Sequence, residues 1–292
     1  MRAASNVRRT LRVVVLVACG LLLQACTTVQ FAYNQMQHLA YWQLNSYLDL
    51  SDAQRERARD ELGELHRWHR AAMLPRHADL LQKVQQQLPS ALSRDQVCST
   101  YDTARTQIDK VIAHAEPQLV WLASALTDAQ ISHLQRKQAD SNADWKKEWV
   151  DVTPDTLREQ RFKQLSSRAE TFYGTLEAPQ KAALTTFIAQ SSFEPQRTYA
   201  ERLRRQKDLV EVLQKIAKDR TNTEQARTLV RGYLARFNAS PDVAYQRYVE
   251  TLVTEGCEGL ARVHNTMTTA QRVKAVQSLQ GYSQEFLLLA GR

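Results

Sequence analysis

Three histidines lie close together in the sequence and are the first candidates for metal chemistry. His66 and His69 are three residues apart, and His77 follows eight residues later. On a helix the first two imidazoles would lie on one face and could share a metal ion. No HExxH or Glu-x-x-His spacing accompanies them, and Arg67 and Arg70 add positive charge that opposes a divalent cation. We therefore expect packing or solvated histidines, with Arg70 pairing an acid elsewhere, and we predict no metal and no cofactor.

Isolated glutamates could act as general acids in glycan cleavage, and the candidates are Glu61, Glu64, Glu255 and Glu258. A glycosidase holds such a group in a shaped pocket, which loops usually build. With 8 Gly and 7 Pro in 292 residues, the chain offers few turns. It also contains no Gly-x-Ser-x-Gly motif, no P-loop and no Gly-x-Gly-x-x-Gly fingerprint. We therefore expect a protein that is not an enzyme, with a murein hydrolase as the catalytic alternative.

A basic run could bind anionic lipid head groups or peptidoglycan carboxylates, and it consists of Arg202, Arg204, Arg205 and Lys207. Acidic residues flank it at helical pairing distances, namely Glu201, Asp208 and Glu211. We therefore expect a solvated helix face with internal ion pairs.

The first 26 residues have the pattern of an export signal. Four arginines precede an apolar run over 13–23, which is shorter than the roughly 20 residues that a membrane span needs. The segment ends in Leu23-Gln24-Ala25-Cys26, which resembles the lipobox of bacterial lipoproteins. The resemblance implies that residues 1–25 are removed, that the Cys26 thiol is acylated, and that the protein reaches the periplasmic face of the outer membrane, since Thr27 rather than Asp follows. An ordinary signal peptide that happens to hold a cysteine is the alternative.

Removal of residues 1–25 changes the charge of the chain. These residues contain four Arg and no acid, so the remainder has 35 basic and 31 acidic residues, a net charge of +4 rather than +8. This balance and the compartment argue against nucleic acid as a partner.

Two cysteines are left for an oxidising compartment once Cys19 is removed and Cys26 is acylated. The periplasm favours a disulfide between Cys98 and Cys257, and two buried free thiols are the alternative. A bridge across about 160 residues would stabilise the fold by roughly 5 kcal/mol in the chain-entropy model. Gly256 and Gly259 flank Cys257, and we expect them to allow the close helix approach that the bridge requires.

Apolar residues recur at steps of three and four along almost the whole chain, which predicts an all-α fold, an elongated antiparallel helical bundle. We expect helices to start near residues 28, 51, 76, 93, 127, 154, 178, 195, 222, 240 and 268. Pro75 and Pro117 are expected to kink helices. If Pro75 only kinks a helix, the start near residue 76 does not begin a separate one, and the eleven starts correspond to ten helices.

A capping box with an apolar residue before the N-cap recurs along the chain. Its N-cap and N3 residues are Ser51 and Gln54, Ser93 and Gln96, Thr127 and Gln130, Thr268 and Gln271, together with Asn222 and Gln225, and a degenerate copy covers 176–180. The spacing of the boxes suggests an internal duplication, and independent use of a common capping device is the alternative. The predicted organisation is a signal peptide (1–25), a lipidated N-terminus with an aromatic first helix (26–49), and helical repeats at 50–153 and 154–292 within a single compact unit.

The first helix is rich in aromatic residues and begins shortly after Cys26. Apolar residues form a stripe with a spacing of about 3.5 residues, made by Val29, Tyr33, Met36, Ala40, Leu44 and Tyr47. We expect this stripe to pack on the bundle. The alternative is that the helix rests in the head-group zone of a membrane, where Trp and Tyr are favoured.

A set of motif residues resembles the N-terminal signature of an uncharacterised family of Gram-negative envelope lipoproteins, and it consists of Tyr33, Asn34, Tyr47-Leu48-Asp49-Leu50, Gln54, Trp68, His69, Arg70, Leu74 and Pro75. Members tend to carry a Tyr after Leu-Pro, where this chain has His77. The family has no established activity. The Leu-Thr-x-x-Gln boxes are also similar to the paired motif of small periplasmic stress chaperones that form helical cradles.

The expected function is a non-catalytic binding or scaffolding role in the cell envelope. The expected partners are the membrane, through the lipid anchor, and an envelope protein or peptidoglycan. A chaperone-like binder of unfolded periplasmic clients and a murein hydrolase are the alternatives.

Overall fold

The computed structural model describes residues 29–219 and 222–291, and every regular element in these ranges is helical. The predicted all-α fold is therefore confirmed. A first helix spans residues 29–48. It is followed by α2 (Asp52–Trp68), α3 (Leu74–Gln87), α4 (Arg94–His114), α5 (Glu116–Ala125), α6 (Asp128–Trp145), α7 (Pro154–Tyr173), α8 (Ala178–Gln190), α9 (Pro195–Asp219), α10 (Thr223–Asn238), α11 (Val243–Asn265) and α12 (Thr269–Leu289), with π-helical turns η1 (His69–Met73) and η2 (Lys146–Val150). The predicted signal peptide and Cys26 lie outside the described residues. Nowhere in the described ranges does a helix combine the length and apolar character needed to cross a membrane.

The two prolines act differently on their helices. The helical path continues from α2 through η1 into α3, so Pro75 does not interrupt it. Proline cannot donate to the carbonyl four residues earlier, here that of Ala71, and the π-helical turn contains that residue. Pro117, by contrast, lies at the start of a separate helix, because α4 ends at His114 and α5 begins at Glu116.

The helix starts agree with the capping boxes found in the sequence. In α2, for example, the Ser51 amide donates to Oε1 of Gln54 over 2.9 Å, and the Gln54 amide donates back to the Ser51 hydroxyl. The same reciprocal pair opens α4, α6, α10 and α12. The degenerate copy is also a box, with Glu177 as the N-cap of α8.

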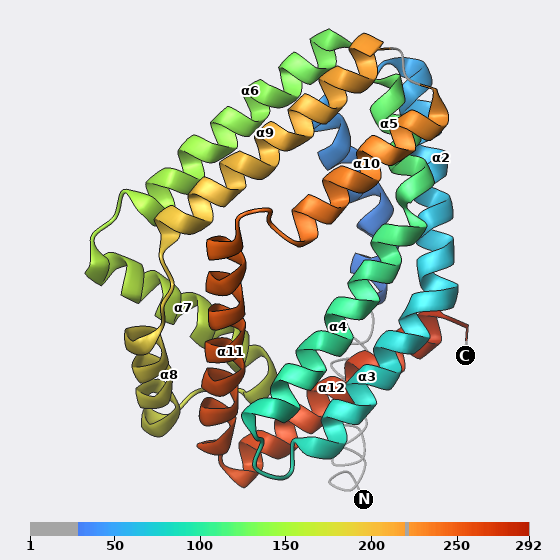
Figure 1. The fold of residues 1–292 in the computed structure, drawn as a ribbon. Coiled ribbons are helices and arrows are strands. Elements are labelled where there is room, and N and C mark those ends of the chain that lie inside the picture. Colours follow the sequence, from blue (N-terminus) through green and yellow to red (C-terminus); the bar gives the residue numbers. More distant parts are fainter. Residues whose placement is uncertain (1–28, 220–221, 292) are drawn as a thin grey trace, which may run out of the picture.

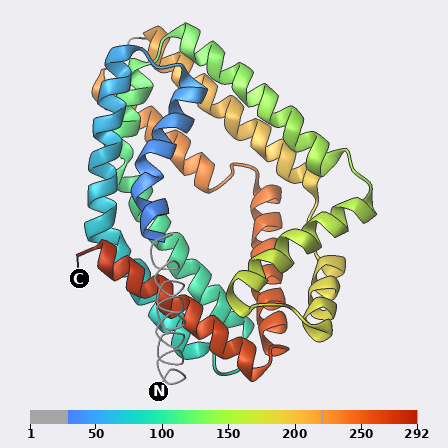
Figure 2. The same ribbon diagram turned by 180° about the vertical axis from the view of Figure 1, so that it is seen from behind.

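The helices follow one another round an elongated, closed outline, and the first helix lies in front of it in Figure 2 (Figure 1 and Figure 2). Two long pairs, α3 with α12 and α6 with α9, run antiparallel on opposite sides. Two further pairs, α4 with α11 and α5 with α10, connect the early and late parts of the chain.

Two hydrophobic cores lie at opposite ends of this outline. Core A contains Leu48, Leu50, Ala58, Val120, Ala123, Leu126, Ile131, Leu134, Val210, Val212, Leu213, Ile216, Ala226 and Val230. Core B contains Leu88, Tyr173, Leu176, Leu184, Ile188, Val263, Met267, Ala275 and Leu279. Core A includes residues of α9 and α10, which belong to the predicted repeat at 154–292. Core B includes Leu88, which belongs to the predicted repeat at 50–153. The boundary at 153/154 stays a prediction, but the two ranges share both cores.

The helix contacts have an internal symmetry. When the first helix is matched with α7, α2 with α8, and so on to α6 with α12, each half has six helices. The contact of α3 with α12 then corresponds to that of α9 with α6, and the contact of α4 with α11 to that of α10 with α5. The contact of α2 with α5 likewise corresponds to that of α8 with α11. This matching is what a duplicated six-helix unit would produce, and the duplication stays a prediction.

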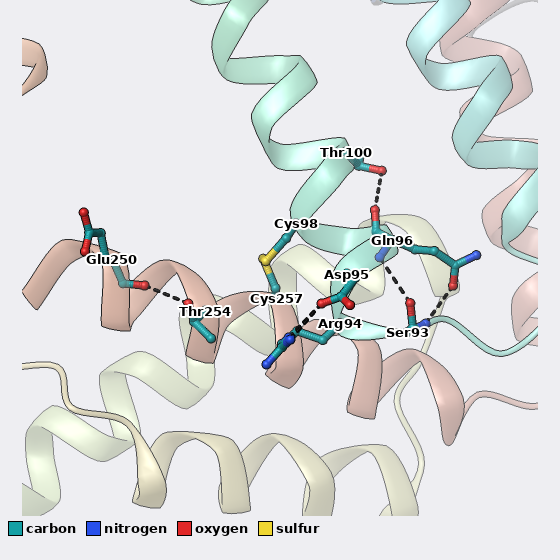
Figure 3. The surroundings of a disulfide bond; sticks show 9 residues. All are labelled: Ser93, Arg94, Asp95, Gln96, Cys98, Thr100, Glu250, Thr254 and Cys257. Atoms are coloured by element: carbon teal, nitrogen blue, oxygen red, sulfur yellow. Dashed lines mark hydrogen bonds and ion pairs between the residues drawn. A yellow bond between two sulfur atoms is a disulfide. The ribbon is translucent and has the colours of Figure 1, made fainter. Parts of the chain in front are cut away.

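A disulfide joins Cys98 of α4 to Cys257 of α11, the pair that the sequence predicts, with the two Cα atoms 5.4 Å apart (Figure 3). Cys98 follows the box glutamine Gln96 by two residues, and Cys257 precedes Gln271 by fourteen. The same offsets from Gln225 and Gln130 lead to Arg227 and Glu116, which form an ion pair of 3.5 Å between α10 and α5. One crossing of the symmetric pair is therefore covalent, and the other is ionic.

The two glycines beside Cys257 do not serve the bridge in the way the sequence suggests. A Cβ at Gly256 would meet nothing within 4 Å. A Cβ at Gly259 would lie 2.4 Å from the Phe187 ring, so this glycine admits α8 rather than the disulfide partner α4. The expectation that both glycines bring α4 close is therefore wrong.

Candidate functional site

The first helix packs on α2 through a stripe that differs from the expected one. Its buried and half-buried side chains include those of Tyr33, Gln37, Tyr41, Leu44 and Leu48, and Val29 and Tyr47 of the expected stripe are half-buried as well. From Tyr33 to Leu48, successive members of this stripe are four, four, three and four residues apart. Their average spacing is therefore longer than the expected spacing of about 3.5 residues. Among the expected members Met36 is 51% exposed, and Ala40 is also exposed. The expectation was therefore wrong in the middle of the helix.

The motif residues of the first helix and of the α2–η1 region meet at Tyr33, which is 5% exposed. Its hydroxyl is hydrogen-bonded to Nδ1 of His69 over 2.9 Å, and its backbone carbonyl oxygen lies 3.1 Å from Nε2 of His66. Arg70 donates to the amide oxygen of Asn34, and its guanidinium carbon lies 5.5 Å from the centre of the Tyr33 ring. The acid expected for Arg70 is replaced by an amide and an aromatic ring. We call these five residues the helix clamp.

Polar contacts connect the helix clamp to α4. Nε2 of His69 and Nε2 of His77 are 3.4 Å apart, and Nδ1 of His77 is hydrogen-bonded to the side-chain oxygen of Gln107. Gln107 in turn donates to the backbone oxygen of Arg76 over 3.1 Å. A chain of polar contacts therefore runs from the first helix through η1 and α3 to α4.

A second aromatic contact joins the same helices. The indole of Trp68 stacks on the imidazole of His114 with ring centres 3.7 Å apart and planes within 5° of parallel. This motif residue therefore connects the end of α2 with α4.

The pKa values of the two histidines and of Tyr33 in the helix clamp are shifted so that their neutral forms are favoured. Burial lowers the pKa of His69 to about 4, and the neighbouring His77 and His66 add to this effect. Burial also lowers the pKa of His66 and raises that of Tyr33. At neutral pH the imidazole of His69 is uncharged, which suits its position beside Arg70. Across the described ranges, no three His, Cys, Asp or Glu side chains gather in a way that could hold a metal ion.

The candidate general acids lie in two pairs, on α2 and on α11, and each carboxylate has a nearby partner. Glu61 pairs with Arg57 over 3.3 Å, and Glu64 lies 3.9 Å from Arg67. Glu258 pairs with Arg262 over 2.8 Å.

Glu255 accepts hydrogen bonds from the backbone amide and the hydroxyl of Ser192. Glu255 and Glu258 line a surface pocket with Phe187 and Gly259. Glu255 therefore connects α11 to the loop before α9, whereas Glu258 pairs within α11.

The three arginines of the basic run are half-buried and turn toward partners in the molecule, while Lys207 is exposed and pairs with Glu211 as expected. Arg204 and Arg205 each donate to the buried carboxylate of Glu201 over 2.8 Å, and Ser240 donates to the same group. Burial alone would raise the pKa of Glu201, but these hydrogen bonds outweigh it, so the pKa lies below its usual value. Arg202 donates to Asn142 on α6 over 2.6 Å. The flanking acids do pair with the run as expected, but the expected exposure is wrong for Arg204.

The capping boxes are joined in pairs, which the sequence reasoning missed. The side-chain amide of Gln54 donates to the backbone oxygen of Ala125 over 2.6 Å, and that of Gln130 donates to Asp49 over 3.0 Å. The two glutamines also bond one another. Each amide thus reaches the backbone two residues before the N-cap of the other box, and we call this arrangement a clasp.

A second clasp has the same form. Gln180 donates to the backbone oxygen of Thr266 over 2.5 Å, and Gln271 donates to that of Thr175 over 2.9 Å. The first clasp lies at core A and the second at core B. The near identity of Leu50-Ser51-Asp52-Ala53-Gln54 and Leu126-Thr127-Asp128-Ala129-Gln130 is the signal that could have suggested the pairing.

The model of a family of unknown function (DUF6279) matches residues 46–232. The match includes η1 and the boxes from α2 to α10. Neither the curated proteins nor the solved structures contain a match to the chain.

Proposed function

Because the chain belongs to DUF6279, a family of unknown function, we propose its role from its own residues: a lipoprotein anchored to the periplasmic face of the outer membrane, with a non-catalytic binding or scaffolding role in the cell envelope. The observation that carries the proposal is the helix clamp. Its motif side chains fix the helix that follows Cys26 to the rest of the molecule. A rigid attachment of this kind suits a protein that presents a surface at a defined place on a membrane.

The compartment is supported by two further features. The segment over residues 1–26 has the order of an export signal with a lipobox. The bond between Cys98 and Cys257 is of the kind that persists in oxidising compartments such as the periplasm.

The non-catalytic role is supported by the contacts of the candidate acids, which are engaged with neighbouring arginines or with Ser192. The similarity to stress chaperones rests on the boxes, whose glutamines are engaged in the clasps. Gln130, Gln180 and Gln271 are between 1% and 8% exposed, so they hold helix starts together and do not offer their amides to a client.

Lipidation is tested by expressing the full chain in a Gram-negative host and measuring the mass of its N-terminal peptide. We expect an acylated Cys26 as the first residue and recovery of the protein with the outer membrane. Cys26→Ser should remain unprocessed, while Cys19→Ser should behave as the parent does. A parent protein with an unmodified Cys26 would contradict the proposal.

The binding role is tested by crosslinking in intact cells from a photoreactive residue at an exposed position such as Val243, which is 55% exposed. We expect a defined crosslinked partner, either an envelope protein or peptidoglycan. Release of soluble fragments from purified sacculi by the protein would contradict a non-catalytic role.

A further inference from the structure

The first helix carries no charged side chain. Residues 29–48 contain no Asp, Glu, Lys or Arg, although these types make up 24% of the chain. Large apolar side chains are nevertheless exposed on this helix: Phe31 by 67%, Met36 by 51%, Leu39 by 63% and Trp42 by 67%. Such a concentration of exposed apolar groups marks an interaction surface more often than a scattered single residue does.

These side chains lie on the side of the helix that faces away from the molecule. At about 100° per residue, Phe31, Leu39 and Trp42 fall within an arc of about 80°, and this arc is opposite the stripe of Tyr33 and Leu48. Figure 2 shows the helix on one face of the molecule, in front of the other helices. We call this outward side the outer face.

Arginines of α2 and η1 border the first helix. Arg59 donates to the Tyr41 hydroxyl over 3.0 Å, and its guanidinium carbon lies 4.4 Å from the ring centre. Arg70 donates to the side chain of Asn34, and its guanidinium carbon lies 5.5 Å from the Tyr33 ring centre. Within the described part of the chain, neither arginine forms an ion pair with a carboxylate. The outer face is therefore apolar in its middle and has unneutralised cations beside it.

We propose that the outer face lies in the boundary between head groups and acyl chains of a phospholipid membrane, with Arg59 and Arg70 facing anionic head groups. Aromatic residues and arginine are favoured in this zone. The inference rests on the proposed anchoring at Cys26. Phe31 follows Cys26 by five residue steps, which span at most about 18 Å, so the acyl chains and the outer face would enter the same leaflet.

Docking of the outer face would fix the orientation of the molecule. A lipid anchor alone leaves a protein free to tilt about its N-terminus. The outer face and the helix clamp together would hold the closed outline of helices at one angle to the membrane.

Fluorescence quenching of Trp42 tests the proposal. The lipidated full chain is reconstituted into vesicles of phosphatidylethanolamine and phosphatidylglycerol, with and without brominated acyl chains. We expect brominated chains to quench the parent more strongly than Trp42→Phe, because the variant removes the one tryptophan on the outer face. Equal quenching of both proteins would overturn the docking.

A matched pair of variants tests the rest of the face. Phe31→Gln combined with Leu39→Gln should reduce the quenching of Trp42 at least threefold, while the lipid anchor keeps the protein on the vesicles. Ile108→Gln on α4, where the side chain is 58% exposed, should leave the quenching unchanged. An equal response to both changes would overturn the assignment of the outer face.

The outcomes separate this inference from the proposed function. If the parent carries no acyl group and does not bind vesicles, the proposed anchoring fails. If the parent is acylated and bound but Trp42 is not quenched, only the docking fails. Sedimentation of the lipidated protein in detergent as a dimer that the Phe31 and Leu39 changes dissociate would assign the face to a second copy and overturn docking on lipid.

Discussion

His69 is the residue at which pH acts most directly on the helix clamp. Its neutral imidazole accepts or donates one hydrogen bond with Tyr33 and lies beside two other imidazoles. The sequence indicated that the histidines pack rather than bind metal, but it could not identify their partners. Tyr33, the partner of His69, is 36 residues away along the chain. Arg70 binds Asn34 rather than an acid because of the way in which the first helix packs on the α2–η1 region.

A fall in pH should destabilise the protein through His69. The pKa is about 4 in the folded state and about 6.5 in an unfolded chain, so between these values only the unfolded state takes up the proton. The contribution of this histidine is complete above pH 6.5 and is lost as pH falls toward 4. From pH 7.5 to pH 5 we expect a loss of roughly 1 to 2 kcal/mol, reduced by partial solvent exposure. Urea unfolding of the parent and of His69→Gln at both pH values measures it, and an identical pH dependence in the two proteins would refute the assignment.

Two glycines on α11 provide a matched test of packing. Gly259→Ala should destabilise the protein by about 1 to 3 kcal/mol, because the new methyl group would overlap the Phe187 ring. Gly256→Ala meets open space and should stabilise the helix by about 0.5 to 1 kcal/mol. Thermal or urea unfolding gives both values, and the expectation fails if the two changes have the same sign.

At the scale of elements, the capping boxes made the helix starts predictable. The expected starts near 51, 93, 127, 154, 178 and 195 lie within a residue or so of α2, α4, α6, α7, α8 and α9. Such boxes are local, since an N-cap and its N3 residue recognise one another within a single turn. The clasps and the spacing of the buried stripe on the first helix were not predictable from local sequence, because both depend on contacts with a second helix.

The clasps should make some box glutamines more important than others. Gln130→Ala removes bonds to Thr127, Asp49 and Gln54, and we expect a loss of about 3 kcal/mol. Gln96→Ala removes only the local capping bond to Ser93, and we expect a loss of about 1 kcal/mol. Equal losses in urea unfolding would mean that the clasp adds nothing beyond capping.

At the scale of the whole molecule, the sequence predicted helices and a duplication. It did not predict that helices of one half pair with helices of the other. Capping and periodicity report on neighbours in the chain, whereas the pairing of α3 with α12 and of α6 with α9 joins residues far apart. The disulfide joins α4 to α11, and the ion pair of Arg227 with Glu116 joins α10 to α5 at the equivalent positions. This equivalence depends on contacts between helices that are far apart in the chain.

This relation predicts that a second disulfide can be built. The positions of Glu116 and Arg227 correspond to those of Cys257 and Cys98, whose Cα atoms are 5.4 Å apart. Glu116→Cys combined with Arg227→Cys should form a bridge on oxidation and raise the melting temperature relative to the reduced variant. Thiol counting and thermal unfolding with and without reductant measure this, and two free thiols after oxidation would show that the crossings differ in geometry.

The sharing of both cores between early and late helices sets the order in which the protein can assemble. Core A takes buried residues from α9 and α10 as well as from the earlier helices, so it is complete only when about the first four fifths of the polypeptide can fold together. Without α9 and α10, core A stays incomplete and the apolar side chains of the earlier helices are more open to proteases. Folding of this chain is therefore a late event, and a truncated product that ends before α9 should be degraded rather than accumulate as a folded half.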